Sequence, residues 1–261
     1  MTLRALIFDV DGTLADTEEA HRQAFNGAFR EHGLGWEWSQ DVYAGLLWVT
    51  GGKERIDRYV DSLRVAPAEK GQLKRLVPQI HATKTRIYAR LVGMGNVALR
   101  PGIVRLIAEA RTAGVRLAIA STTTPANLSA LVTATLGSAA ISWFDAIATG
   151  DVVPNKKPAP DIYLKALASL NLPPERCVAF EDSEIGVRAA KGAGLFTVAT
   201  PTRWSEAQDF GAADVVLPSL GDPDNPLDEA SETRIGAKFL GLAQLRALHS
   251  TPRNSVRAME A

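Results

Sequence analysis

The chain is poor in cysteine, with Cys177 alone among its 261 residues. A single cysteine excludes an internal disulfide framework and any zinc site that needs several thiolate ligands. Cys177 also begins a strongly apolar run, CVAF. We therefore interpret it as a buried packing residue of a strand rather than as a nucleophile.

An excess of charge of either sign is also lacking. Lys plus Arg and Asp plus Glu both number 29, so the formal net charge is zero. Without a broad basic field, neither nucleic acid nor an anionic membrane is an expected partner. No apolar run approaches the ~20 residues of a membrane span. The N-terminus leads directly into a strand-like run rather than a signal peptide, so we expect a cytoplasmic protein.

What is present is an alternation of apolar strand-like runs with helical patterns from about residue 98 onward. This alternation predicts an α/β fold, a Rossmann-like parallel sheet with right-handed crossovers and helices on both faces. Residues 3–8 have the continuous apolar character of a strand buried on both faces. The further expected strands are 115–120, 144–148, 177–180, 195–199 and 213–217, and the expected helices between them are 125–136, 158–170 and 183–193.

A helical insertion is expected after the first strand. Helical patterns cover residues 18–32 and 68–91, and no convincing strand lies between them. The predicted domains are a Rossmann-like core (1–15 and 96–225), an inserted α-helical cap (16–95) and a partly loose C-terminal extension (226–261). Within the extension, residues 235–248 predict one amphipathic helix, and the last dozen residues predict a loose tail.

Polar side chains gather where the strands are expected to end. Ligands of an open parallel sheet bind at the carboxyl ends of its strands, so these side chains should meet at one rim. The residues at these ends are Asp9 and Asp11, Ser121 and Thr122, Lys156 and Lys157, and Glu181 and Asp182.

Four carboxylates at one rim repel one another unless a cation lies among them. A set of oxygen ligands without Cys or His favours a hard ion, and Mg²⁺ in particular. Mg²⁺ usually shares its coordination sphere with a phosphate, whose other oxygens a lysine and a hydroxyl would bind. The pattern therefore predicts phosphoryl transfer. A calcium loop is excluded because its sixth and twelfth positions, a glycine and a glutamate, are Leu14 and Ala20 here.

Four short motifs in this order resemble those of the haloacid dehalogenase superfamily. They are DVDGT at 9–13, Ser121 or Thr122 after a strand, Lys157 in KKPAPD, and EDS at 181–183. The resemblance spans about residues 3–217. It is closest to the subgroup of β-phosphoglucomutases, phosphoglycolate phosphatases and CbbY-type sugar phosphatases. TGGKER at 50–55 and LRPGI at 99–103 look most like the CbbY-type enzymes.

The resemblance implies a role for each motif residue. Asp9 would be the nucleophile that forms an aspartyl-phosphate. Asp11 would be the general acid and then the general base, and its backbone carbonyl would bind the metal. Asp9 and Asp182 would hold Mg²⁺, while Glu181 would either join them or only cap a helix. The transferring phosphoryl group would be bound by Lys157, Ser121 and Thr122.

The resemblance also implies that the helical cap closes over the site and contributes to substrate binding. Glu18 and His21 are three residues apart on a predicted helix, so both can face the same side. A structural or solvated role is the alternative for His21, and an ordinary surface charge is the alternative for Arg55 and Lys84. The matching cap residues are Glu18, His21, Lys53, Arg55 and Lys84.

The sequence thus predicts a Mg²⁺-dependent phosphatase for a small phosphorylated sugar. The CbbY-type resemblance implies xylulose 1,5-bisphosphate as a possible substrate. A phosphomutase on the same scaffold is the alternative, since the sequence does not show the lifetime of a phospho-aspartate. A non-catalytic phosphosugar-binding protein is a weaker alternative, because it leaves Asp9, Asp11 and Asp182 unexplained together. No segment resembles an oligomerisation module, so we expect a monomer.

Overall fold

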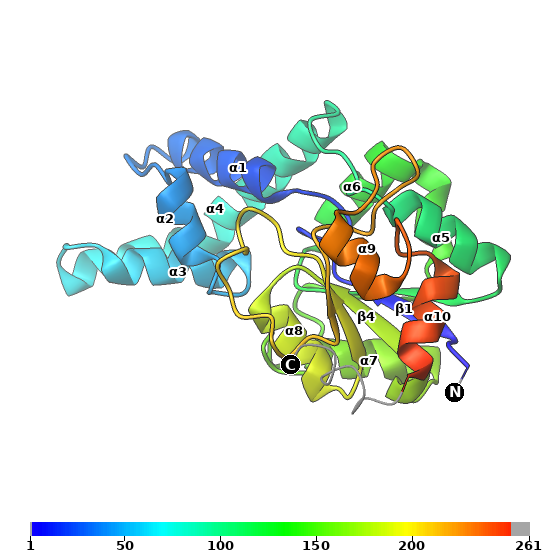
Figure 1. The fold of residues 1–261 in the computed structure, drawn as a ribbon. Coiled ribbons are helices and arrows are strands. Elements are labelled where there is room, and N and C mark those ends of the chain that lie inside the picture. The colour runs from blue at the N-terminus through cyan, green and yellow to red at the C-terminus, as the bar shows by residue number, and fades with distance from the viewer. Residues whose placement is uncertain (1, 252–261) are drawn as a thin grey trace. The chain divides into compact units, whose positions relative to one another are not determined.

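The computed structural model describes residues 2–251 and contains a six-stranded parallel sheet. The strand order is β3-β2-β1-β4-β5-β6, and β1 and β4 lie side by side near the middle (Figure 1). This order confirms the predicted Rossmann-like α/β fold. The strands are β1 Ala5–Phe8, β2 Arg116–Ser121, β3 Ala146–Thr149, β4 Cys177–Glu181, β5 Phe196–Ala199 and β6 Val215–Val216.

The two faces of the sheet bury different side chains because successive residues of a strand point to opposite faces. On one face Ala5 and Ile7 of β1 join a cluster of alanines from neighbouring strands, which packs against α7 (Asp161–Leu170) and α8 (Glu184–Gly192). On the other face Phe8 stacks on Phe180 with 4.7 Å between ring centroids. Both faces are therefore apolar, as the continuous hydrophobic runs predict.

Contacts divide the chain into two compact units. Within the described residues, the sheet unit takes in residues 2–16, Leu99–Ser121 and residues 142–251. The helical unit takes in Thr17–Ala98 and also residues 122–141. The sequence places 125–136 with the sheet, whereas α6 (Pro125–Leu136) packs on α4 (Pro67–Gly93) within the helical unit.

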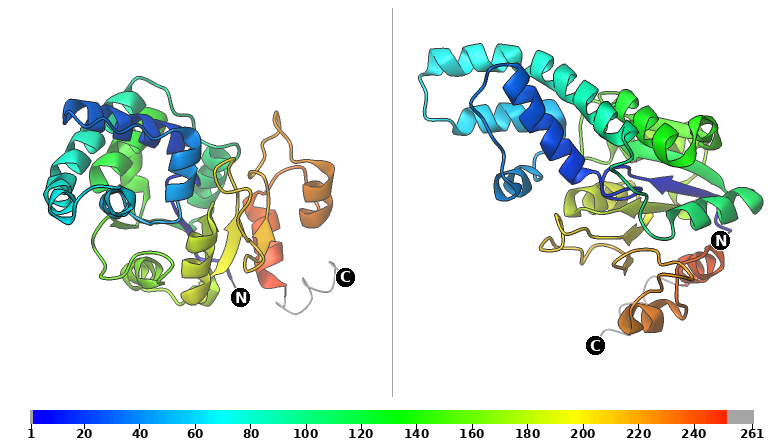
Figure 2. Two further views of the ribbon diagram at one scale, coloured as in Figure 1. Left: turned by 90° about the vertical axis from the view of Figure 1, so that its left-hand side faces the viewer. Right: turned by 90° about the horizontal axis from the view of Figure 1, so that it is seen from above.

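The helical unit contains no strand in residues 17–98, as predicted. Its remaining helices are α1 Glu18–Glu31, α2 Gln40–Leu46 and α3 Gly52–Ser62, and α1 lies along α4 (Figure 2). An aromatic cluster fills its interior: the Phe25 and Trp38 ring centroids are 4.7 Å apart, and Tyr43 is fully buried beside them. Trp48 is not part of this interior, since it is 53% exposed.

The remaining elements before the C-terminal extension are α5 (Ile103–Thr112) and two short 3₁₀ segments. The 3₁₀ segments are Ser138–Trp143, which bridges the two units in sequence, and Pro174–Arg176. No helix among the described residues is long and apolar enough to cross a membrane.

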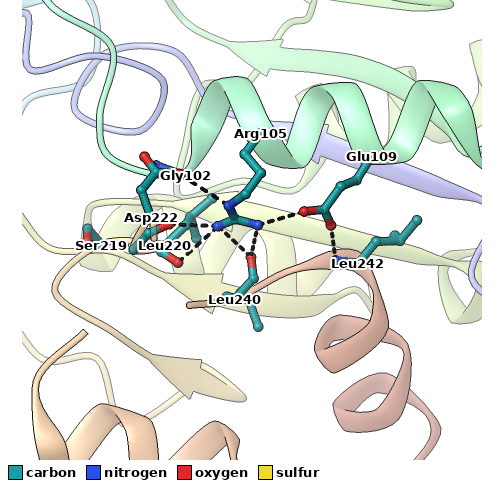
Figure 3. A network of polar contacts seen from close by, with 9 residues as sticks. Gly102, Arg105, Glu109, Ser219, Leu220, Asp222, Leu240 and Leu242 are labelled. Atoms are coloured by element: carbon teal, nitrogen blue, oxygen red, sulfur yellow. Dashed lines mark hydrogen bonds and ion pairs between the residues drawn. The ribbon is translucent and has the colours of Figure 1, made fainter. Parts of the chain in front are cut away.

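The C-terminal extension contains two helices, so the predicted single helix over 235–248 is wrong. These helices are α9 (Glu229–Ile235) and α10 (Leu242–Ser250). Gly236 at φ +68° ends α9 in the left-handed region, where a helix cannot continue. Arg105 of α5 anchors the extension, since its guanidinium bonds Asp222 at 3.2 Å and the Leu240 carbonyl at 3.3 Å (Figure 3). The loose tail predicted beyond residue 251 lies outside the described residues.

Candidate active site

The first two aspartates stand at the carboxyl end of β1, directly beside the end of β4. The backbone N–H of Asp9 donates to the Phe180 carbonyl at 3.0 Å, so Asp9 is level with Glu181. Asp11 follows in a turn in which the Gly12 N–H donates to the Ala15 carbonyl at 2.8 Å. The parallel pairing of β1 with β4 thus brings the predicted carboxylates from both motifs to one edge.

Gly12 is the position where this turn has no room for a side chain. Its φ of +81° lies in the left-handed region, which glycine tolerates best. A Cβ at Gly12 would also lie 2.1 Å from Oδ2 of Asp182. The hydroxyl of Thr13 in turn donates to Oδ1 of Asp182 at 3.4 Å. The turn after β1 and the Asp182 carboxylate are therefore packed directly against each other.

Lys157 joins the two strand ends. Its Nζ lies 2.5 Å from Oδ1 of Asp9 and 2.6 Å from Oε1 of Glu181, and the residue is 6% exposed. Lys156, by contrast, pairs with Asp151 at 2.9 Å. The predicted choice of Lys157 over Lys156 agrees with this placement. A buried ammonium between two carboxylates neutralises part of their charge and fixes both side chains.

Tyr163 is a site residue that the sequence reasoning missed. It lies in the first turn of α7, and its hydroxyl donates to Oε1 of Glu181 at 2.5 Å. The same ring packs beside Lys157, whose Nζ is 5.1 Å from the ring centroid. The available signal was its position six residues after Lys157, at the start of the helix that follows the lysine loop.

Only one of the two carboxylate oxygens of Glu181 has hydrogen-bond partners among residues 2–251. Its Oε1 accepts hydrogen bonds from Lys157 and Tyr163. Its Oε2 is buried and has no hydrogen-bond partner among residues 2–251. That oxygen lies against Gly186 of α8, where a Cβ would be 1.9 Å from it. The lack of a side chain at Gly186 therefore leaves the space that the Glu181 carboxylate occupies. The sequence reasoning did not identify Gly186 as a residue of the site.

The alternative role of Glu181, as a helix cap only, does not agree with this geometry. Ser183 caps α8 instead, because its hydroxyl accepts from the Gly186 N–H at 3.3 Å. Glu181 is 1% exposed and directed toward Lys157 and Tyr163. Its side chain therefore belongs to the carboxylate cluster.

The electrostatics of the cluster reflect burial of more negative than positive charge. Burial raises the pKa of Asp9 to about 7; Lys157 opposes this shift, and the carboxylates of Glu181 and Asp11 add to it. Burial lowers the pKa of Lys157, but the adjacent Asp9 and Glu181 carboxylates outweigh it, so the net pKa is raised. Burial and the neighbouring carboxylates also raise the pKa of the Tyr163 hydroxyl, which stays a proton donor.

Three carboxylates of this cluster have the spacing of a metal site. One ligand oxygen from each of Asp9, Glu181 and Asp182 lies within 4.8 Å of the others. No other group of three or more such side chains meets this spacing within residues 2–251. Their three negative charges exceed the single positive charge of Lys157, and all the donors are oxygens. The residues therefore fit a hard divalent cation such as Mg²⁺.

Ser121 ends β2 at the same edge of the sheet. β1 pairs with β2 up to Phe8 and Ile119, and Ser121 follows two residues after Ile119. Ser121 is buried, and its carbonyl accepts from the Gly150 N–H at 3.2 Å. Thr122 follows it as a partly exposed residue. Thr124 has a different role, since its hydroxyl caps α6 by accepting from the Asn127 N–H at 3.1 Å.

Within the helical unit, the structure brings His21 and Lys84 together. Nζ of Lys84 lies 2.6 Å from Nδ1 of His21, and the His21 ring stacks on Tyr88 at 4.1 Å. Lys84 is 4% exposed and lies 4.8 Å from the Phe25 ring centroid. The alternative of Lys84 as an ordinary surface charge is therefore wrong.

A second cluster of the helical unit links Glu18 to Arg55 through Tyr43. The Tyr43 hydroxyl donates to Oε2 of Glu18 at 2.5 Å and accepts from Nη1 of Arg55 at 3.0 Å. Lys53 lies in the first turn of α3, after Gly51 and Gly52. Tyr43 is thus part of the aromatic interior, and its hydroxyl also orients two of the predicted binding residues.

Comparison with known proteins gives a consistent group of relatives. The model of the haloacid dehalogenase-like hydrolase family matches residues 3–194. Protein CbbY (plasmid) of Cupriavidus necator is 51% identical over 247 residues, which cover 95% of this chain and 97% of that protein. Protein CbbY of Rhodobacter capsulatus is 49% identical over 84% of this chain and 95% of its own length.

Solved structures agree with this grouping. A mutant CbbY from Rhodobacter sphaeroides in complex with xylulose-(1,5)bisphosphate has a TM-score of 0.80 at 45% identity, over 94% of this chain and 99% of that chain. A β-phosphoglucomutase from Clostridium difficile has a TM-score of 0.67 at 21% identity, over 95% and 97% of the two chains. At that identity the second likeness concerns the fold alone.

Proposed function

Because this chain belongs to the haloacid dehalogenase-like hydrolases, we propose that it is a Mg²⁺-dependent phosphatase of small sugar phosphates with Asp9 as its nucleophile. The family and the CbbY relatives support phosphatase activity. The observation that carries the assignment of residues is the buried contact of Lys157 with both Asp9 and Glu181, next to Asp182. It gathers a nucleophile, a cation and metal ligands at one point.

In the first step a carboxylate oxygen of Asp9 attacks phosphorus, and the bond between phosphorus and the sugar oxygen breaks. Asp11 gives its proton to the departing sugar oxygen. Lys157 holds Oδ1 of Asp9 at 2.5 Å, which fixes the orientation of the nucleophile before the substrate arrives. Its positive charge also offsets the charge that develops on the transferring phosphoryl group.

In the second step a water molecule attacks the phosphorus of the aspartyl-phosphate. Asp11, now ionised, takes the proton of that water, the acyl-phosphate bond breaks, and inorganic phosphate leaves. Asp9 regains its carboxylate and Asp11 its proton, so the cycle closes. Ser121, the last residue of β2, and Thr122, which follows it, would bind the remaining phosphoryl oxygens.

Asp9 and Asp182 would hold Mg²⁺, with Glu181 and the backbone carbonyl of Asp11 as further ligands. When bound, Mg²⁺ neutralises phosphoryl oxygens and so favours the charge-dense transition state. This protein's own contribution is the fixed carboxylate cluster, since Gly12 packs on Asp182 and Gly186 packs on Glu181.

We propose a sugar bisphosphate as the substrate, with xylulose 1,5-bisphosphate as the first candidate. The support is the CbbY relative whose structure was solved with that compound. A second phosphate needs cations other than Lys157, and we propose that Lys53, Arg55 and Lys84 of the helical unit supply them. Glu18 and His21 would bind sugar hydroxyls, each oriented by the neighbours described above.

The test is phosphate release from a panel of sugar phosphates, with Mg²⁺ and with EDTA. The panel contains xylulose and ribulose bisphosphates, phosphoglycolate and glucose phosphates. Asp9→Asn should abolish turnover and keep the fold, because the amide cannot attack phosphorus. Asp224→Asn, at an exposed position, is the matched control and should retain full activity. Full activity of Asp9→Asn would refute the assigned nucleophile.

The phosphomutase alternative is separated by the same panel. A mutase would return the phosphoryl group to a sugar, so hexose phosphates would interconvert in the presence of a bisphosphate primer without release of inorganic phosphate. The likeness to β-phosphoglucomutase at 21% identity shows a shared fold and does not favour that reaction.

A further inference from the structure

Arg100 gathers backbone carbonyls from three separate segments of the sheet unit. Its Nη1 donates to the Gly12 carbonyl at 2.5 Å and also contacts the Thr200 carbonyl. Its Nη2 donates to the carbonyls of Pro201 at 3.0 Å and Pro218 at 2.7 Å. One guanidinium therefore connects the turn that carries Asp11 to the loop after β5 and to the segment after β6.

The backbone around Arg100 holds the same turn. The Arg100 N–H donates to the Leu14 carbonyl at 2.9 Å, and Leu99 pairs with Ala15 in an antiparallel bridge. The side chain reaches beyond this bridge to the carbonyl of Gly12, which belongs to the second peptide after Asp11. That peptide is thus fixed from one side by Arg100 and from the other by Asp182, against which Gly12 packs.

The loop after β5 is itself tied to the metal-binding motif. The Thr200 N–H donates to the Glu181 carbonyl at 2.7 Å, and the Ser205 hydroxyl donates to the Asp182 carbonyl at 2.6 Å. Arg100 consequently contacts the turn after β1 and the loop after β5 through backbone carbonyls, with one further contact at 3.3 Å to the Thr200 hydroxyl.

We propose that Arg100 is a positioning residue that fixes the turn of Asp11 relative to Glu181 and Asp182. The inference rests on the proposed function, because the position of this turn affects the rate only if Asp11 transfers the proton. A guanidinium suits the task because its two terminal nitrogens donate in fixed directions to several carbonyls at once. A lysine ammonium presents a single nitrogen and cannot span the same set.

A purely structural tie is the competing interpretation, and Arg105 provides the internal comparison. Its Nη2 donates to the Gly221 carbonyl at 2.7 Å, and its Nη1 bonds the Leu240 carbonyl at 3.3 Å and Oε1 of Glu109 at 2.9 Å (Figure 3). Arg105 is thus also a partly buried guanidinium that holds carbonyls of the sheet unit. None of these partners belongs to the turn of residues 9–15.

The experiment compares Arg100→Met with Arg105→Met in the full-length protein. Both variants should lose thermal stability. Only Arg100→Met should lower kcat, by about tenfold to a hundredfold for a displacement near 1 Å, while KM changes less than twofold. Added methylguanidinium should restore part of the kcat of Arg100→Met, because it can occupy the space that the side chain leaves. It should leave Arg105→Met unchanged.

Hydrogen–deuterium exchange tests, independently of turnover, whether Arg100 holds the turn of residues 9–15 in place. The amides of residues 9–15 should exchange faster in Arg100→Met and at the unaltered rate in Arg105→Met. Unaltered exchange there, or equal kcat in the two variants, overturns the proposal. If Arg100→Met fails to fold, Arg100→Lys, which keeps the charge but cannot donate to the same set of carbonyls, replaces it in the kcat and exchange measurements. Failure of the proposed function would appear differently, as absent turnover in the unsubstituted protein.

Discussion

The substitution Gly186→Ala tests whether the space beside Glu181 is a requirement of the site. A Cβ at this position would lie 1.9 Å from Oε2 of Glu181 and 2.1 Å from its Cδ. These distances are more than 1 Å too short, so either the carboxylate or α8 must move. The carboxylate has little freedom, because Lys157 and Tyr163 hold its other oxygen at 2.6 and 2.5 Å.

Two opposing effects determine the stability of this variant. Alanine is favoured over glycine inside a helix by about 1 kcal/mol. Overpacking in a buried site is unfavourable by about 1–3 kcal/mol, and loss of one hydrogen bond to the charged carboxylate adds about 1.5–3 kcal/mol. We therefore expect Gly186→Ala to lower the free energy of unfolding by roughly 1.5–5 kcal/mol. A displacement of Glu181 also moves Lys157, so kcat should fall about a hundredfold.

Gly192→Ala in the same helix is the control. A Cβ at Gly192 would be 3.4 Å from the nearest atom, in Pro160, and the residue is exposed. This variant should be as stable as the parent or more stable by about 0.4–1 kcal/mol, with unchanged kcat. Urea denaturation and phosphate release measure both variants. The reasoning is refuted if Gly186→Ala matches Gly192→Ala in stability and in rate.

Two further side chains give simple tests. Tyr163→Phe removes the hydroxyl that donates to Glu181 and keeps the ring volume, so it should lower the free energy of unfolding by about 1.5–3 kcal/mol and reduce kcat. Urea denaturation with the unsubstituted protein as reference checks this, and equal midpoints would contradict it. Burial raises the pKa of the Cys177 thiol to about 12, so at pH 8 it is neutral in the native protein. Ellman's reagent should therefore react with Cys177 only after unfolding, and rapid modification of the native chain would contradict its burial.

Much of the fold was predictable because each strand of the sheet is a short continuous apolar run. The first predicted strand, 3–8, ends at Phe8 as β1 does, and the fourth, 177–180, differs from β4 by one residue. The prediction failed where local conformation depends on single residues. The pattern over 235–248 is apolar at helical spacing, yet Gly236 in the left-handed region separates α9 from α10.

The candidate site was predictable to the extent that its residues are charged and follow strands. Asp9, Lys157, Glu181 and Asp182 meet at the sheet edge because parallel pairing brings strand ends together. Tyr163 was not found, because a tyrosine at the start of a helix has no distinctive pattern until its hydroxyl is seen to reach Glu181.

Gly12 and Gly186 explain why the buried carboxylates of the site stay in one conformation although their negative charges repel one another. Free carboxylates would turn away from one another, since their repulsion is strong at low dielectric. Here Gly12 and Gly186 leave only enough space for the carboxylates of Asp182 and Glu181, where a Cβ would overlap each. The side chains are thus placed by packing as well as by Lys157, so the carboxylate cluster is preorganised for the cation and the phosphoryl group that we propose it binds.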